Sequence, residues 1–423
     1  MIRILKEDPL FAYLLGLRIP KRRTSLENFQ KFLKKLGDPH LFLPPTIHIA
    51  GTNGKGSVLS FLKAMLQTSG YKVHTYTSPH LIHLTERIML AGKPIDPQTL
   101  KNLIGQVIEA SAGESLSFFE IITATAFLAF SKFPADILLL EAGIGGRLDP
   151  TNVIVNPLCS VITSVSQDHT ELLGQTLNEI AREKAGIIKP YSPVITIHQD
   201  QEVVERIRKT AYIRHAPFYQ IYPRTDLQEV KLGLPGLHQI HNASLAVSIL
   251  DILENFADFK VLSQDRIKGL ETVFWPGRLQ RLDQKKWKLP KDCELWVDGA
   301  HNPHAAVQIA ATLKQWESKH LFLIIVLQKT KDAMEFLKPF QGLVQEVKTL
   351  SLEGYNNFYS AKALERIAHT LGFSTQSYRN LEDAIASIRT TLAMSPVPSR
   401  ILICGSLYLV GQVLALENTT IFD

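Results

Sequence analysis

The chain has 423 residues, of which 45% are hydrophobic and 20% charged, and its formal net charge is +6. This balance is typical of globular proteins and excludes collagen-like and low-complexity chains, and the length predicts two or three domains. No apolar run reaches the roughly 18 residues of a membrane helix, so we expect no membrane partner. The charge suits anionic ligands, but basic and aromatic residues are not interleaved, so nothing favours nucleic-acid binding.

The N-terminal segment and the cysteines indicate a cytoplasmic protein. Acidic residues interrupt the first segment, and the basic cluster Lys21-Arg22-Arg23 follows its apolar part, so we expect no signal peptide. The three cysteines, at 159, 293 and 404, lack metal-site spacing, and two lie in apolar surroundings. We therefore expect buried free thiols in a reducing compartment.

The most informative stretch is Gly51–Ser57, with the sequence GTNGKGS, which follows the β-rich run Thr46–Ala50 and precedes a helical pattern. Strand, glycine-rich turn, lysine, hydroxyl and helix together are typical of a phosphate-binding loop. The glycines let backbone N–H groups approach phosphate oxygens, while Lys55 can neutralise phosphate charge and Ser57 can bind Mg²⁺. In the common Walker A pattern the hydroxyl residue follows the lysine directly, whereas here Gly56 intervenes. The alternative is an ordinary strand-to-helix turn.

Strand-like runs alternate with amphipathic helical patterns along most of the chain, which predicts doubly wound α/β sheets. The expected strands after the first are 72–76, 136–141, 159–164, 193–197, 294–298, 321–326, 347–350 and 400–404. Expected helices include 178–188, 300–316 and 381–392. The polar, basic segment 281–293 is predicted to link an N-terminal domain, 1–280, to a C-terminal domain, 294–423.

Polar clusters follow the ends of several predicted strands: Ser78, Glu141, Asp168-His169, Asp298 and Gly405-Ser406. Open α/β sheets bind ligands at the carboxyl ends of their strands. A carboxylate such as Glu141 at the tip of a buried strand is unfavourable unless it is paired or binds a metal, which favours Mg²⁺ beside the phosphate loop. Each cluster alone fits an ordinary turn, but together they favour a ligand site.

Taken together, these motifs resemble the Mur ligase superfamily and, within it, dihydrofolate synthase/folylpolyglutamate synthase. The resembling stretches keep the family's order: 50–57, 77–81, 118–120, 141–152, 168–169, 173–174, 182–187, 238–243, 275–278, 298–303 and 404–406. The resemblance implies a P-loop-type, mostly parallel sheet in the N-terminal domain and a smaller Rossmann-like C-terminal α/β domain. Related peptidoglycan ligases carry a UDP-binding domain before the ATP loop, and the about 45 residues that precede the loop strand are too few for it.

The resemblance also implies roles for individual residues. The ATP phosphates would be held by Gly54, Lys55, Gly56 and Ser57, and the rest of ATP by Asn242, Arg278 and Asp298. Two Mg²⁺ sites are implied, one formed by Ser57, Ser78 and Glu141 and one by His169. The pterin pocket would be lined by Ser117, Phe119, Glu120, Leu148 and Asp149.

The remaining implied roles concern catalysis and glutamate. Lys184 resembles the family lysine that CO₂ carboxylates to a carbamate, although on pattern alone it also fits a solvated surface lysine. His301 and Ser406 would hold L-glutamate, and Lys55, Lys184 and His301 would be catalytic. This sequence departs from the family pattern at two places. In the turn that binds the pterin in bifunctional bacterial members, Arg23-Thr24-Ser25 replaces Asp-Leu-Gly, and residues 327–332 lack the family's usual glycine.

The implied activity is ATP-dependent ligation of L-glutamate to dihydropteroate, to folates or to both, through an acyl phosphate. The family also implies a monomer. Two alternatives are a ligase of the same superfamily acting on another acid, and a nucleotide-binding regulatory protein without chemistry.

Overall fold

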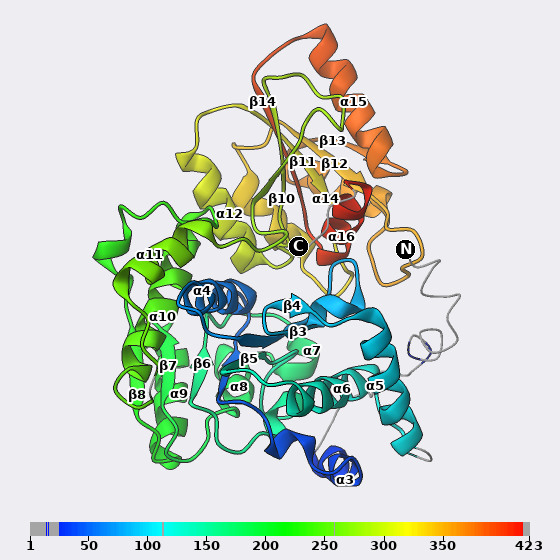
Figure 1. The fold of residues 1–423 in the computed structure, drawn as a ribbon. Coiled ribbons are helices and arrows are strands. Elements are labelled where there is room, and N and C mark those ends of the chain that lie inside the picture. The colour runs from blue at the N-terminus through cyan, green and yellow to red at the C-terminus, as the bar shows by residue number, and fades with distance from the viewer. Residues whose placement is uncertain (1–13, 15, 17–24, 112–113, 258, 418–423) are drawn as a thin grey trace. The chain divides into compact units, whose positions relative to one another are not determined.

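The computed structural model describes residues 14, 16, 25–111, 114–257 and 259–417. The chain forms two compact units, which are described separately (Figure 1). Of the described residues, the first contains those up to Gly233 and Ile240–Val273, and the second contains Leu234–Gln239 and those from Phe274 to residue 417. The predicted boundary at 280 therefore lies inside the second unit, and the start of the predicted linker belongs to one of its strands. Arg23 and Thr24 of the pterin turn lie outside the described residues.

The first unit is built on a sheet with the strand order β4-β3-β2-β5-β1-β6-β7-β8 (Figure 1). Its strands are β1 (Thr46–Ala50), β2 (Val73–Tyr76), β3 (Ile88–Leu90), β4 (Lys93–Pro94), β5 (Ile137–Glu141), β6 (Cys159–Ile162), β7 (Val194–Ile197) and β8 (Phe218–Ile221). All neighbours are parallel except the β2–β3 and β3–β4 pairs. β1 and β5 lie next to each other inside the sheet and are buried along their whole length, because helices cover both faces of the sheet.

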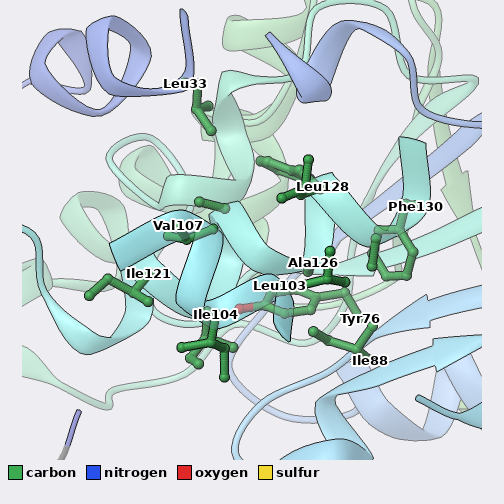
Figure 2. Close-up of a cluster of buried hydrophobic side chains, with 14 of the residues drawn as sticks. Leu33, Tyr76, Ile88, Leu103, Ile104, Val107, Ile121, Ala126, Leu128 and Phe130 are labelled. Atoms are coloured by element: carbon green, nitrogen blue, oxygen red, sulfur yellow. The ribbon is translucent and has the colours of Figure 1, made fainter. Parts of the chain in front are cut away.

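The helices of this unit are α3 (Glu27–Lys35), α4 (Lys55–Thr68), α5 (Pro97–Ala110), α6 (Phe118–Lys132), α7 (Thr170–Leu173), α8 (Leu177–Ala185), α9 (Gln201–Ile213), α11 (Ser263–Thr272) and most of α10 (Leu237–Leu253). Figure 2 shows the apolar core formed by α5 and α6 against β2 and β3, with Leu103, Ile104, Phe130, Tyr76 and Ile88 among its side chains. Each fully buried apolar side chain contributes about 1.5–3 kcal/mol to folding, so this core holds β2 in place.

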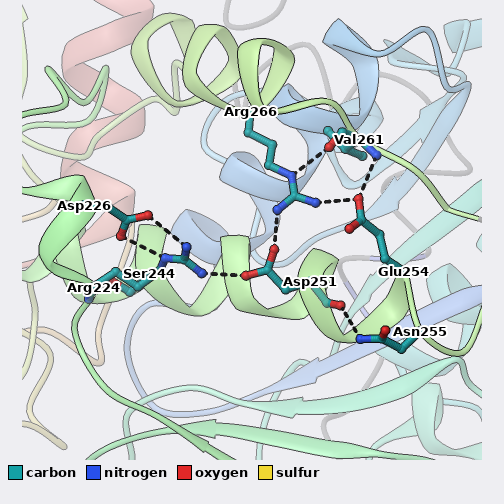
Figure 3. Close-up of polar contacts among 8 residues, drawn as sticks. All are labelled: Arg224, Asp226, Ser244, Asp251, Glu254, Asn255, Val261 and Arg266. Carbon is teal, nitrogen blue, oxygen red and sulfur yellow. Dashed lines mark hydrogen bonds and ion pairs between the residues drawn. The ribbon is translucent and has the colours of Figure 1, made fainter.

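An ion-pair network ties α10 to α11 and to the segment after β8 (Figure 3). Asp251 on α10 accepts from Arg224, at 2.5 Å, and from Arg266 on α11. Arg224 also pairs with Asp226 at 2.9 Å, and Arg266 with Glu254 at 2.6 Å. Exposed pairs are individually weak, but here two arginines share the Asp251 carboxylate, so the pairs form a connected network.

The second unit contains a sheet with the order β13-β12-β11-β14-β10-β9, parallel except for the β9–β10 pair. Its strands are β9 (Gln280–Leu282), β10 (Cys293–Val297), β11 (His320–Ile325), β12 (Glu346–Leu350), β13 (Ser374–Tyr378) and β14 (Ser399–Cys404). Its helices are α12 (Pro303–Gln315), α13 (Ala333–Leu337), α14 (Ala361–Thr370), α15 (Leu381–Met394) and α16 (Leu407–Leu416). The predicted fold class, with two mostly parallel α/β sheets, is confirmed.

Two further expectations bear on the described residues. None of their helices is long and apolar enough to cross a membrane. The three cysteines are buried and free, as the sequence indicated.

Candidate active site

The predicted phosphate loop connects β1 to α4 and is held in place from two sides. Gly54 has φ +89°, and a side chain there would place its Cβ 2.6 Å from Asn242 Oδ1, so only glycine fits and Asn242 lies against the loop. Ser164 O accepts from Thr52 N–H at 2.8 Å, and Thr163 Oγ1 donates to Asn53 O at 2.7 Å. The amide groups at the start of α4 are therefore fixed in an orientation that suits an anion.

Three of the predicted site residues converge at the carboxyl ends of the neighbouring strands β2, β5 and β1. Lys55 Nζ donates to Gly51 O at 3.1 Å and lies 3.9 Å from Glu141 Oε1. Glu141 is only 5% exposed, and its Oε2 accepts from Ser78 N–H at 3.3 Å. Lys55, Ser78 and Glu141, which lie far apart in the sequence, thus lie close together in the first unit.

The donors at this edge fit a hard divalent cation. Ser57, in the first turn of α4, and Ser78 offer hydroxyl oxygens, and Glu141 offers a carboxylate. No group of three or more His, Cys, Asp or Glu side chains suitable for a metal occurs among the described residues. A cation here would accordingly take oxygens from hydroxyls and from a ligand's phosphates in addition to Glu141.

Lys184 lies in α8 and is 3% exposed, so the alternative of a solvated surface lysine is wrong. Burial and the neighbouring charge of Lys55 lower the pKa of Lys184 to about 7, although Asp168 and Asp149 oppose this change. A large fraction of this amine is therefore neutral near pH 7, and a neutral amine is nucleophilic.

His169 immediately precedes α7 and lies in the left-handed backbone region, with φ +50°. Its backbone N–H donates to Asp168 Oδ1 at 2.9 Å, and its Nδ1 lies 3.8 Å from Glu171 Oε1. Its role as a ligand of a second metal stays a prediction.

The residues predicted for the pterin pocket lie at the start of α6 and in the loop after β5. Ser117 and Glu120 bond to each other, since Glu120 Oε2 accepts from Ser117 Oγ at 2.7 Å and forms a capping box. Phe119 lies against the loop, because a Cβ at Gly143 would sit 2.6 Å from its ring. Leu148 is half-buried, and Asp149 is buried and accepts several hydrogen bonds from its own loop.

In the second unit, predicted site residues follow β10 and β14, which are neighbours in the sheet. Asp298 accepts from the N–H groups of Leu279 at 2.8 Å and Ala300 at 2.7 Å, and burial raises its pKa although the Arg278 charge opposes this. His301 Nδ1 lies 2.8 Å from its own turn, at Gly299 O. Gly405 N–H donates to Ala300 O at 2.7 Å and so brings Ser406 to the same edge.

Sequence reasoning missed the support beneath the phosphate loop. Thr163 and Ser164 were expected to end a strand, but β6 stops at Ile162 and both hydroxyls bond to Asn53 O. Two hydroxyl residues directly after an apolar strand were the available signal.

Comparisons with known proteins show the family and the fold of this chain. Residues 49–250 match the family model of the Mur ligase middle domain, and residues 280–416 match that of the dihydrofolate synthetase C-terminal domain. The chain is 31% identical to dihydrofolate synthase/folylpolyglutamate synthase of Bacillus subtilis, over 92% of this chain and 94% of the relative. It is 33% identical to dihydrofolate synthetase of Saccharomyces cerevisiae, over 93% and 98%.

A solved structure is similar over a comparable length. It is the bifunctional folylpolyglutamate synthase/dihydrofolate synthase of Yersinia pestis complexed with AMPPNP and a Mn ion. The TM-score is 0.84 at 27% identity, and the match covers 97% of this chain and 98% of that one.

Proposed function

Because this chain belongs to the dihydrofolate synthase/folylpolyglutamate synthase family, we propose how its own residues carry out that family's reaction. The protein is an ATP-dependent ligase that joins L-glutamate to dihydropteroate, to folates or to both. The observation that carries the residue assignment is the meeting of Lys55, Ser78 and Glu141 at one sheet edge.

The reaction activates a carboxylate before it meets an amine. The carboxylate oxygen of the acid substrate attacks the γ-phosphorus of ATP, and the bond to the β-phosphate oxygen breaks, which gives an acyl phosphate and ADP. The glutamate amine then attacks the acyl carbon and loses a proton, and the tetrahedral intermediate collapses to an amide and phosphate. Phosphoryl transfer asks the protein mainly for positioning and charge stabilisation.

Lys55 and the phosphate loop supply that stabilisation. The triphosphate, the substrate carboxylate and Glu141 are all negative, and two like charges ~4 Å apart repel by about 4 kcal/mol at an effective dielectric near 20. Lys55 offsets this repulsion, while the N–H groups around Gly54 and Gly56 bind phosphate oxygens. A divalent cation, held by Ser57, Ser78 and Glu141 with a second at His169, would supply further positive charge to the phosphates.

We assign a carbamate to Lys184. Its buried amine, with a pKa of about 7, supports nucleophilic attack on CO₂, in which a C–N bond forms and a proton is released. The side chain thereby changes from a cation to an anion, which removes its repulsion of Lys55 and adds a ligand group beside the cation site.

The second substrate and the rest of ATP are assigned to the residues that the family resemblance indicates. Arg278 and Asp298 in the second unit would bind the nucleotide, as would Asn242 beside the phosphate loop, and His301 and Ser406 would bind L-glutamate. The pterin would be bound by Ser117, Phe119, Glu120, Leu148 and Asp149. We further propose a monomeric enzyme, as in the family, and a cytoplasmic one, for which the buried free thiols are supporting evidence.

The decisive experiment measures ADP release with dihydropteroate or tetrahydrofolate, each with L-glutamate and Mg²⁺. Turnover with one or both acids that depends on glutamate supports the assignment and identifies the acid. Turnover only with a peptidoglycan precursor would indicate another ligase of the superfamily. ATP binding without acid- and amine-dependent turnover would indicate a regulatory protein.

A further inference from the structure

We propose that His48, in the middle of β1, is a positioning residue of this ligase: it fixes the loop Gly143–Thr151, which follows β5, against the strand that leads into the phosphate loop. The inference rests on the proposed function, because that loop and Phe119 are assigned there to the acid substrate. His48 itself is fully buried and does not contact the substrate.

A continuous chain of hydrogen bonds joins His48 to this loop. His48 Nε2 lies 2.8 Å from Thr151 Oγ1, and Thr151 Oγ1 donates to Asp149 Oδ1 at 2.6 Å. The other carboxylate oxygen, Asp149 Oδ2, accepts from the N–H groups of Gly143 at 2.9 Å and Ile144 at 3.1 Å. One carboxylate thus holds both ends of the loop, and His48 fixes that carboxylate through Thr151.

The direction of the bonds determines where the imidazole carries its proton. A threonine hydroxyl has one proton, and Thr151 donates it to Asp149, so Thr151 Oγ1 must accept from His48 Nε2. Burial, with a smaller contribution from the Lys189 charge, lowers the pKa of His48 to about 3. The ring is therefore neutral, protonated on Nε2, and its Nδ1 is an acceptor.

Fold stability alone does not explain a histidine at this place. His48 Nδ1 is buried and has no hydrogen-bond partner within the described part of the chain, and burying an acceptor without a donor destabilises a fold. His74 on β2 is the structural counterpart. Its Nδ1 accepts from Ala91 N–H, and its Nε2 donates to Phe133 O, each at 2.9 Å. Both ring nitrogens of His74 are therefore hydrogen-bonded to the backbone.

The test replaces His48 by Met, which is apolar, has a similar volume and lacks the N–H donor. We expect the KM for the acid that the wild type uses to rise about tenfold, as for one lost hydrogen bond, with an unchanged KM for ATP. Because the unsatisfied acceptor is also removed, Tm should not fall. His48→Gln, whose amide N–H can reach Thr151, should restore most of the wild-type KM.

A double-mutant cycle establishes that His48 acts through Thr151. Thr151→Val keeps the shape of the side chain and removes the hydroxyl, and the H48M/T151V variant should be no worse than T151V alone. His74→Met is the matched control, for which we expect a lower Tm and an unchanged KM for the acid.

Three outcomes would overturn the inference: an unchanged KM for the acid in His48→Met, additive effects in the cycle, or a parallel rise of both KM values with a lower Tm. Absence of turnover in the wild type would instead refute the proposed function. The binding constant of dihydropteroate for the same variants, measured by calorimetry, would then still decide the role of His48.

Discussion

The two units carry polar residues at the same kind of sheet edge but use them differently. In the first unit, the carboxyl ends of β1 and β5 bring the charges of Lys55 and Glu141 to within 3.9 Å of each other. In the second unit, at the ends of β10 and β14, Asp298 accepts from the backbone N–H groups of Leu279 and Ala300, and Ser406 accepts from that of Tyr408. At the first edge a lysine faces a glutamate, whereas at the second edge a carboxylate and a hydroxyl hold backbone N–H groups.

The two arrangements predict different kinetic effects of substitutions at the two edges. Opposite charges at the first edge can act on charge that develops during phosphoryl transfer, which changes kcat. Groups that shape turns at the second edge position a ligand, which changes KM. The comparison fails if variants of the two units have the same kinetic signature.

The largest effect is expected from removing either charge of the first edge. Lys55→Ala and Glu141→Ala should each lower glutamate-dependent ADP release on the order of 10³-fold, because the first removes a positive charge beside the phosphates and the second removes the carboxylate that would hold the cation. The measurement is a coupled assay of ADP. Lys31→Ala, on the exposed face of α3, is the control and should match the wild type. Near-normal turnover of either variant would refute the assignment.

The second effect concerns Lys184. Lys184→Ala should lower kcat about 10²-fold, and a short carboxylic acid such as acetate should restore part of it, because the acid replaces the missing carbamate. Labelled CO₂ should be retained by the wild type and not by the variant. Lys189→Ala is the matched control, since this lysine is also largely buried and donates to Asn152 O at 2.8 Å. Rescue of both variants, or of neither, would contradict a carbamate at Lys184.

The order of sheet strands explains why much of the site was predictable. Apolar runs such as Ile137–Leu140 are visible in the sequence, and a polar residue that follows a parallel strand must lie at its carboxyl edge. Glu141 and Ser78 therefore meet Lys55 as expected. Sequence reasoning missed β3, β4, β8, β9 and β13. The strands β3 and β4 have only three and two residues, and β8, β9 and β13 are partly exposed edge strands, so none has a long apolar run.

Other features could not be predicted, because they depend on contacts between distant residues. Burial of Lys184 arises from packing around α8, and a lysine beside a glutamate in a helix otherwise resembles a solvated pair. The bond between His48 and Thr151 spans 103 positions of sequence, and no local pattern pairs a residue inside one strand with a residue in the loop after another. The domain boundary was placed after Trp275–Arg278, although contacts assign this stretch to the second unit.

A smaller effect on the reaction is expected in the second unit. Ser406→Ala should raise the KM for L-glutamate about tenfold and leave kcat nearly unchanged, because one ligand hydrogen bond is lost. Ser406 also caps α16, so the variant loses about 1 kcal/mol of stability. Ser360→Ala, which removes the equivalent cap of α14, is the matched control. Equal KM values for glutamate in the two variants would show that Ser406 only caps its helix.

Replacement of Glu294 on β10 is expected to have the smallest effect on the reaction. Its main effect should be on the free energy of unfolding. Its carboxylate accepts from Lys319 at 2.8 Å and from Arg400 at 2.7 Å. Burial alone would raise the pKa of Glu294, but these hydrogen bonds, with a further one from Trp296, outweigh burial and lower the pKa to about 2. A folded-state pKa below the unfolded value of 4.5 contributes stability that is complete above pH 4.5. That contribution is lost as the pH falls from 4.5 towards 2.

Urea unfolding between pH 2 and pH 7 checks this expectation. Glu294→Gln should be less stable at pH 7 and should lose less stability on acidification, because its side chain does not titrate. Both KM values and kcat should stay at wild-type values at pH 7, since Glu294 lies at the amino end of its strand and the predicted site residues lie at the carboxyl end. Glu353→Gln, at an exposed pair with Arg379, is the control and should keep the wild-type pH profile. An altered KM for glutamate in Glu294→Gln would show that the two ends of this sheet are coupled. Residues that stabilise the second unit could then not be separated from residues that bind the substrate.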